Sequence, residues 1–89
     1  MSHQLRLERE RVDWREVDGE LIALERSESV YLAANSSATI LWRALANGTT
    51  EAALAELLVS TYGISRVAAR ADVARFLADL GARGLLAAA

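Results

Sequence analysis

Residues that could carry out chemistry are few in this chain, and none stands at a catalytic spacing. The 89-residue sequence has one histidine, His3, and no cysteine. Nucleophilic catalysis needs a base beside a nucleophile, and His3 lies in a charged N-terminal segment that offers no such pair. Acidic pairs such as Asp72 and Asp79 are typical of a solvated surface rather than of acid–base catalysis. Cysteine, histidine and carboxylate side chains do not cluster at the spacing that metal ligands need. The five glycines are scattered and form no phosphate-binding loop. The sequence therefore predicts a protein that is not an enzyme, with no metal and no cofactor.

The charge balance disfavours nucleic-acid binding. The net charge is −2 and the sequence pI is about 5.3, whereas DNA-binding domains are usually basic. The last predicted helix does carry four arginines, Arg66, Arg70, Arg75 and Arg83. Two aspartates share that helix, so we expect no nucleic-acid partner. A winged-helix DNA-binding protein stays open as an alternative.

Composition predicts one small folded domain in the cytoplasm. Hydrophobic residues make up 53% and charged residues 25%, a balance that favours folding over disorder. No run approaches the roughly 20 apolar residues that a membrane span needs, so we expect no membrane partner. The lack of cysteine fits a reducing compartment. We expect a flexible tail over residues 1–10, where charge is dense and periodicity absent, followed by one domain over residues 11–86.

Three strands should form a meander at the start of the domain. RVDWREV alternates and is separated from ELIALER by Asp18–Gly19, a strong hairpin signal, which places strands at about 11–17 and 20–26. A second two-residue turn at Ser27–Glu28 would lead to a third strand over residues 30–34.

With two-residue turns, strand alternation places one apolar set on a single face of this sheet. The set is Val12, Trp14, Leu21, Ala23, Val30, Leu32 and Ala34. Tyr31 would then lie on the opposite face, beside Ile22 and Leu24.

Three helices follow, each with an apolar stripe and recognisable end signals. The first should start at Asn35 or Ser36 and end at Asn47–Gly48, the second runs from Thr49 or Thr50 to Gly63, and the third runs from Ser65 to Gly84–Leu85. The expected fold is α+β and winged-helix-like, with a three-stranded antiparallel meander packed on three helices. In this order the third strand lies at an edge. Exposed edges are usually protected by charge or proline, and Val30 to Ala34 has neither.

The order and spacing of three segments resemble the PqqD-like domains, also called RiPP recognition elements. The segments are VYLAANSSATILWRALANGTT, LAELLVSTYGIS and ADVARFLADLGARGLL. The similarity runs from about Trp14 to Leu86. Its most specific parts are Asn35 with Trp42 seven residues on, the helix stop at Tyr62–Gly63–Ile64, and the ending that runs through Asp72–Val73, Phe76–Leu77 and Gly84–Leu85–Leu86. One departure is Ala34, where the family often has a large aliphatic residue. Stand-alone members from lasso peptide pathways look most similar.

The resemblance implies a binding adaptor. Family members receive the leader region of a ribosomal precursor peptide as an added strand beside the third strand, in a groove closed by the third helix. The implied site residues are Val30, Tyr31, Leu32, Ala33, Ala69, Arg70, Val73, Phe76 and Leu77. The first four supply backbone hydrogen bonds, with Val30 and Leu32 as the groove floor. The helix residues form pockets for apolar peptide side chains, with Ala69 and Arg70 at the mouth.

Further implied partners are a leader peptidase, a cyclase or a radical SAM maturation enzyme. A peptide chaperone of the PQQ type, serving a radical SAM enzyme, is the alternative within the family. A homodimer through the bare edge also stays open.

Overall fold

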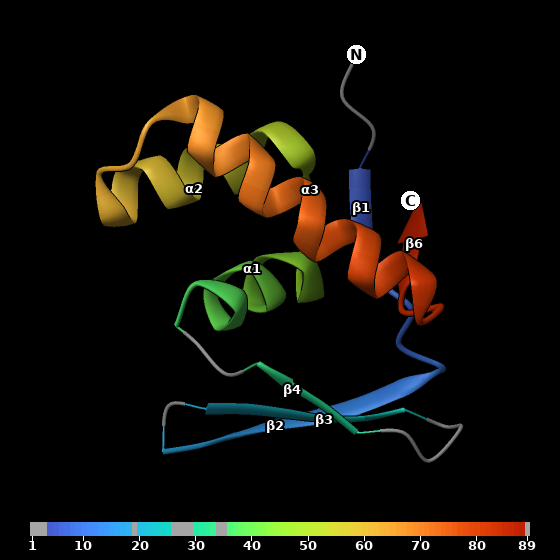
Figure 1. Ribbon diagram of the computed structural model, residues 1–89. Helices are drawn as coiled ribbons and strands as arrows, with labels where there is room; N and C mark the ends of the chain where they lie inside the picture. Colours follow the sequence, from blue (N-terminus) through green and yellow to red (C-terminus); the bar gives the residue numbers. More distant parts are fainter. Residues whose placement is uncertain (1–3, 19, 26–29, 34–35, 89) are drawn as a thin grey trace.

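The computed structural model describes residues 4–18, 20–25, 30–33 and 36–88 of the chain. The elements in order are β1 (Gln4–Leu7), β2 (Val12–Val17), β3 (Glu20–Glu25), β4 (Val30–Ala33), α1 (Ser36–Ala46), β5 (Thr49–Thr50), α2 (Glu51–Tyr62), α3 (Arg66–Ala82) and β6 (Leu86–Ala88). Figure 1 shows α1 between the β2–β3–β4 sheet on one side and α2 with α3 on the other. The α+β class with three helices and antiparallel sheets is confirmed.

The first predicted hairpin is present. β2 and β3 pair antiparallel from Val12↔Glu25 to Val17↔Glu20, which leaves two residues in the turn. Asp18 has a positive φ of 51°, as the first central residue of the favoured two-residue hairpin turn requires. An Asp-Gly pair suits this turn because both residue types tolerate positive φ.

The register of the second hairpin differs from the prediction by one residue. β3 pairs antiparallel with β4, with Leu24 opposite Val30 and Ala23 opposite Tyr31. Five residues, 25–29, separate the paired residues Leu24 and Val30. A hairpin with a two-residue turn has an even number of residues between any two paired positions, so the connection between β3 and β4 is not a two-residue turn. The expected turn at Ser27–Glu28 itself lies outside the described residues, as does Ala34.

Because of this one-residue shift, each residue of the third strand lies on the face of the sheet opposite to the predicted one. The register places Tyr31 opposite the buried Ala23, so the prediction that Tyr31 accompanies Ile22 and Leu24 is wrong. The prediction that Val30 and Leu32 share a face with Leu21 and Ala23 is wrong for the same reason, because their register partners are Leu24 and Ile22.

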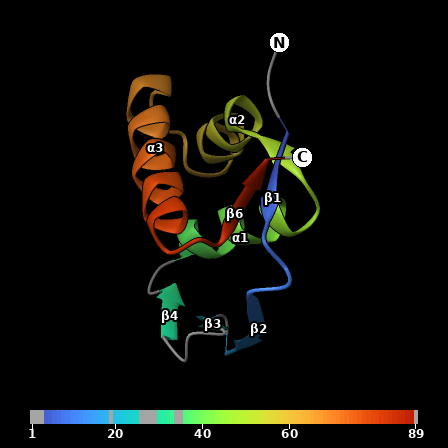
Figure 2. The same cartoon turned by 90° about the vertical axis from the view of Figure 1, so that its right-hand side faces the viewer.

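A second sheet, ordered β5–β1–β6, was not predicted. The expectation of a flexible tail over residues 1–10 is wrong for residues 4–7, which form the central strand of this sheet. Leu7 is 2% exposed and belongs to the core, so apolar burial as well as pairing holds β1 in place. Figure 2 shows β1 and β6 side by side next to the helices, away from the β2–β3–β4 meander.

The helices begin and end where local chemistry predicts. The Thr50 side chain accepts a hydrogen bond from Ala53 N at the start of α2, and Ser65 accepts one from Ala68 N at the start of α3. Gly63 ends α2 with a φ of 67°, a left-handed conformation that glycine adopts without strain. Among the described helices, none is long and apolar enough to cross a membrane.

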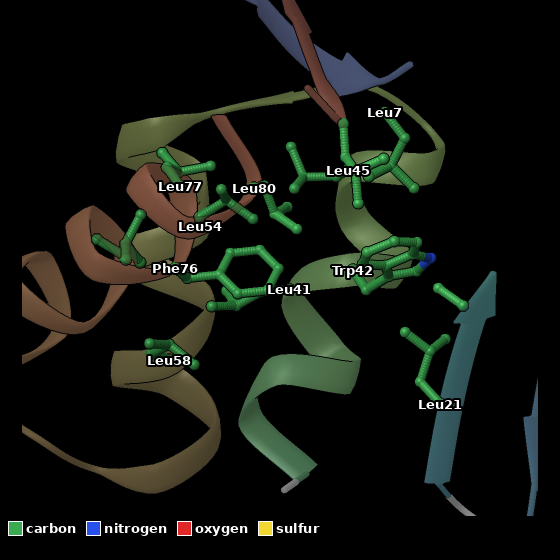
Figure 3. Packing of buried hydrophobic residues seen from close by; sticks show 14 of the residues in the cluster. Leu7, Leu21, Leu41, Trp42, Leu45, Leu54, Leu58, Phe76, Leu77 and Leu80 are labelled. Atoms are coloured by element: carbon green, nitrogen blue, oxygen red, sulfur yellow. The ribbon is translucent and has the colours of Figure 1, made fainter. Parts of the chain in front are cut away.

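The centre of the core joins α1 to the meander. Trp42 on α1 has no exposed surface and meets Trp14 of β2 edge-on, with ring centroids 5.6 Å apart. Figure 3 shows Trp42 facing Leu21 of β3. Arg43 also ties α1 to β2, since its Nε donates to Glu16 at 3.0 Å, and this hydrogen bond lowers the pKa of the Glu16 carboxyl. The sheet and the first helix therefore form one packed unit.

Candidate functional site

The two edges of the meander differ sharply in charge. The sheet order β2–β3–β4 places β2 at one edge and β4 at the other, as predicted for the third strand. β2 reads VDWREV and carries three charged side chains, Asp13, Arg15 and Glu16, while β4 reads VYLA and carries none. Charges on an edge strand discourage pairing with another chain. Within the described ranges β4 pairs only with β3, so its other backbone edge is available for a further strand.

Residues of α3, and Arg83 just after it, make contacts near the two ends of β4. At the start of β4, Glu25 lies one residue beyond the Leu24↔Val30 pair and accepts a 3.4 Å hydrogen bond from Arg83 at the end of α3. Past the end of β4, Ser37 of α1 and Phe76 of α3 line the same hollow. Ser37 follows Ala33 by four residues, a span of at most about 14 Å. Both observations connect α3 to the chain just outside β4, and Figure 2 shows α3 and β4 on one side of the molecule.

The hollow between α1 and α3 has a volume of about 300 Å³ and an apolar floor. Its lining residues are Ser37, Ala38, Leu41, Leu58, Asp72, Arg75 and Phe76. We call it the α1–α3 hollow. Figure 3 shows the Phe76 ring beside Leu41. A second hollow of about 270 Å³, which includes Tyr62 and Ile64, adjoins it through the shared residues Ser37, Leu58 and Asp72.

Charged groups line the α3 side of the site. Asp72 and Arg75 form an ion pair at the hollow, with side chains 46% and 76% exposed. Arg83 lies just after the C-terminal end of α3. Partial burial alone would lower the pKa of Arg83, but the carboxylates of Asp79 and Glu25 outweigh this effect and raise the pKa above its usual value. Glu25 is 6% exposed, so its carboxylate depends on Arg83 as a partner. This pair fixes the end of α3 against the sheet.

The predicted helix residues fall into three groups. Ala69 and Val73 have no exposed surface, so they support the site from within the core. Phe76 and Leu77 are each 9% exposed, and Phe76 lines the α1–α3 hollow. Arg70 is exposed and lines neither of the two hollows; at 3.6 residues per turn it lies about 120° around the helix from Phe76. Backbone of Val30 to Ala33 forms β4 itself.

Sequence reasoning missed the residues that complete the hollow. Asp72 and Arg75 lie four and one positions before Phe76, on the flank of α3 that faces α1. Ser37 and Ala38 come from the first turn of α1. A helical wheel centred on Phe76 would have selected Asp72, and the short link from β4 to α1 would have selected Ser37.

No group of three or more histidine, cysteine or acidic side chains that could hold a metal ion occurs in the described part of the chain. The fold and the site thus define a small domain with an open sheet edge and, between α1 and α3, a hollow in which buried apolar residues meet a charged pair. The sequence profile of the family described as Coenzyme PQQ synthesis protein D (PqqD) matches residues 20–86. The chain belongs to the PqqD family, and the resemblance found in the sequence is confirmed.

Two solved structures share this fold. One, described as "Lasso peptide synthetase B1 complexed with the leader peptide", is 26% identical, with a TM-score of 0.80 over 93% of this chain and 96% of that chain. The other, described as "TbiB1 in Complex with the TbiA(beta) Leader Peptide", is 18% identical, with a TM-score of 0.83 over 91% of this chain and 93% of that one. The second likeness concerns the fold alone. No curated protein sequence matches the chain.

Proposed function

We propose that this protein is a leader-peptide-binding adaptor in the biosynthesis of ribosomally made peptides, with a lasso peptide as the product. The observation that carries the proposal is the uncharged, open edge of β4 beside the α1–α3 hollow. Membership of the PqqD family supports it, as does the similarity over nearly the whole chain to a lasso peptide synthetase B1 whose structure contains a leader peptide.

The peptide binds as an added strand next to β4. Such β-augmentation draws affinity from main-chain hydrogen bonds and specificity from side-chain pockets. Each hydrogen bond contributes about 0.5–1.5 kcal/mol net, and ordering a disordered peptide costs several kcal/mol, so the backbone bonds of a four-residue strand roughly offset that cost. A buried apolar anchor adds about 1.5–3 kcal/mol. The side chain that enters the α1–α3 hollow therefore decides which peptide is bound.

The buried apolar residues and the exposed charged residues of the hollow favour different groups of the peptide. Leu41, Leu58 and Phe76 favour an aliphatic or aromatic anchor. The Asp72–Arg75 pair lies at the same hollow and remains largely exposed, so it meets polar groups of the peptide beside the anchor. We assign the specificity of the adaptor to this combination.

The adaptor has no catalytic step of its own in this proposal. It holds the leader in the cytoplasm and presents the precursor to a leader peptidase, a cyclase or a radical SAM maturation enzyme. A peptide chaperone of the PQQ type is the second candidate, and the family description favours it. Both candidates use the same edge and hollow, and they differ in the precursor that is bound.

Binding of candidate leader peptides tests the proposal. We expect a fluorescently labelled lasso leader to bind saturably, and a scrambled peptide of equal composition to bind at least about 10-fold more weakly, a difference of about 1.4 kcal/mol. Fluorescence polarisation at several salt concentrations measures both. A precursor of the PQQ type, tested in parallel, separates the two candidates.

Duplex DNA serves as the control ligand. Of the three arginines of α3 and Arg83 just after it, three are already engaged in ion pairs: Arg66 with Glu56, Arg75 with Asp72 and Arg83 with Asp79 and Glu25. We therefore expect no DNA binding. Tight, salt-dependent DNA binding together with equal binding of native and scrambled leaders would overturn the proposed function.

A further inference from the structure

The face of the meander that points away from the helices exposes large apolar side chains. Val17, Ile22 and Leu24 retain 46%, 37% and 52% exposure, while the alternate residues Leu21 and Ala23 are buried against the helices. Exposed apolar side chains that cluster on one face mark an interaction surface more often than isolated ones do. We call this surface the outer sheet face.

A depression of about 580 Å³ lies on the outer sheet face. It is lined by Asp13, Trp14, Arg15, Ile22 and Leu24. Asp13 and Arg15 are both exposed, and neither has an ion pair with any residue that the structure describes. The depression therefore offers an apolar surface flanked by one negative and one positive charge that are available to a partner.

The strand register makes this surface complementary to itself. Asp13 stands opposite Leu24, Arg15 opposite Ile22 and Val17 opposite Glu20, so each level of the face pairs one charged residue with one apolar residue. The first two levels carry opposite charges on the same strand, β2. Consider two copies packed with these faces together, related by a two-fold axis that lies midway between the two sheets, parallel to them and perpendicular to the strands. If the axis passes between the two levels, it exchanges them. It brings Asp13 of one copy to Arg15 of the other, and Leu24 of one copy to Ile22 of the other. Two-fold interfaces require this kind of self-complementary patch.

We propose that a second copy of this chain packs on the outer sheet face and forms a two-fold dimer. The charge arrangement favours a second copy as the partner, because the surface supplies its own complement: each charge meets its opposite when the same surface is turned onto itself. Face-to-face packing of two sheets with nearly aligned strands is a common arrangement in proteins. The face is small, so the area buried falls at the low end of specific interfaces and the dimer is weak.

This dimer leaves the site of peptide binding free. The outer sheet face lies on the side of the sheet opposite α1, whereas the peptide would occupy the edge of β4. Each dimer therefore binds two peptides independently. A dimer through the bare β4 edge would instead compete with the peptide. The inference does not depend on the proposed function.

Sedimentation equilibrium up to millimolar protein concentration tests the proposal. We expect a reversible monomer–dimer equilibrium that Leu24→Glu weakens by at least about 10-fold, or about 1.4 kcal/mol. Val67→Glu is the matched control, because Val67 is an apolar residue that is 81% exposed on α3, away from this face, and the substitution should leave the equilibrium unchanged. Circular dichroism spectra establish that both variants remain folded.

A charge exchange supplies the sharper test. Asp13→Arg and Arg15→Asp should each weaken the dimer, and the double variant should restore it, since the exchanged charges meet again across the two-fold axis. A monomer at every concentration would overturn the proposal, as would a dimer that Leu24→Glu leaves intact or a double variant that stays dissociated. Dissociation of the dimer by a saturating leader peptide would also overturn it, in favour of pairing through β4.

Discussion

Phe76→Ala is expected to lower the affinity for a leader peptide by about 10- to 100-fold. Phe76 lines the α1–α3 hollow together with Leu41 and Leu58, so its ring forms much of the surface on which an apolar peptide anchor rests. Loss of such a contact removes about 1.5–3 kcal/mol, and each 1.4 kcal/mol corresponds to about a factor of ten in the dissociation constant. Fluorescence polarisation with a labelled leader measures the change.

Two further variants separate binding from folding. Phe76 is only 9% exposed, so the alanine variant also loses stability. Phe76→Leu keeps an apolar side chain, and we expect it to remain folded with a smaller loss of affinity. Arg70→Ala alters an exposed residue that lies outside the hollow, and affinity should stay unchanged. Similar losses from Arg70→Ala and Phe76→Ala would contradict the assignment of the hollow.

Trp42→Ala is expected to lower the free energy of unfolding by about 3–5 kcal/mol. That is at least about a fifth of the roughly 5–15 kcal/mol that stabilises a typical domain. Trp42 is fully buried and contacts Trp14 across the boundary between α1 and the meander. Its removal therefore opens a cavity where the sheet is attached to the helices.

Urea unfolding followed by far-ultraviolet circular dichroism measures this loss without relying on the fluorescence of the removed indole. Val67→Ala is the control, since a side chain that is 81% exposed should change stability by no more than about 0.5 kcal/mol. A loss below about 1 kcal/mol for Trp42→Ala would mean that Trp42 does not hold the sheet to the helices.

Features that depend on local chemistry could be predicted from the sequence. Thr50, Gly63 and Ser65 mark the ends of α2 and the start of α3 through capping groups that act within a few residues. Asp18–Gly19 likewise predicts the β2–β3 hairpin, because few other residues accept the conformation of its turn. Such signals need no knowledge of the rest of the fold.

Features that depend on partners far away in the sequence could not be predicted from the sequence. β1 pairs with Thr49–Thr50 and Leu86–Ala88, and nothing within residues 4–7 indicates either partner. The β3–β4 register depends on a connection without glycine, and an error of one residue there exchanges the two faces of the strand. Short strands and irregular turns therefore limited the prediction of both sheets.

The sequence predicts the part of the candidate site that lies on the buried side of α3, but not the part on its flanks. The apolar stripe and the family resemblance select Phe76, which the structure places at the hollow. The stripe defines only the buried centre of α3, however. Whether Arg70 or the Asp72–Arg75 flank faces α1 is set by how the helices dock, and the docking brings Asp72 and Arg75 to the hollow with Ser37.

Hydrogen exchange of the backbone amides, followed by NMR as a leader peptide is added, tests the central claim most directly. We expect slowed exchange in β4, at Val30 to Ala33, and new cross-strand contacts between the peptide and β4, while the amides of β2, at Val12 to Val17, keep their exchange rates. A peptide that saturates the protein while β4 exchanges as fast as before would contradict it.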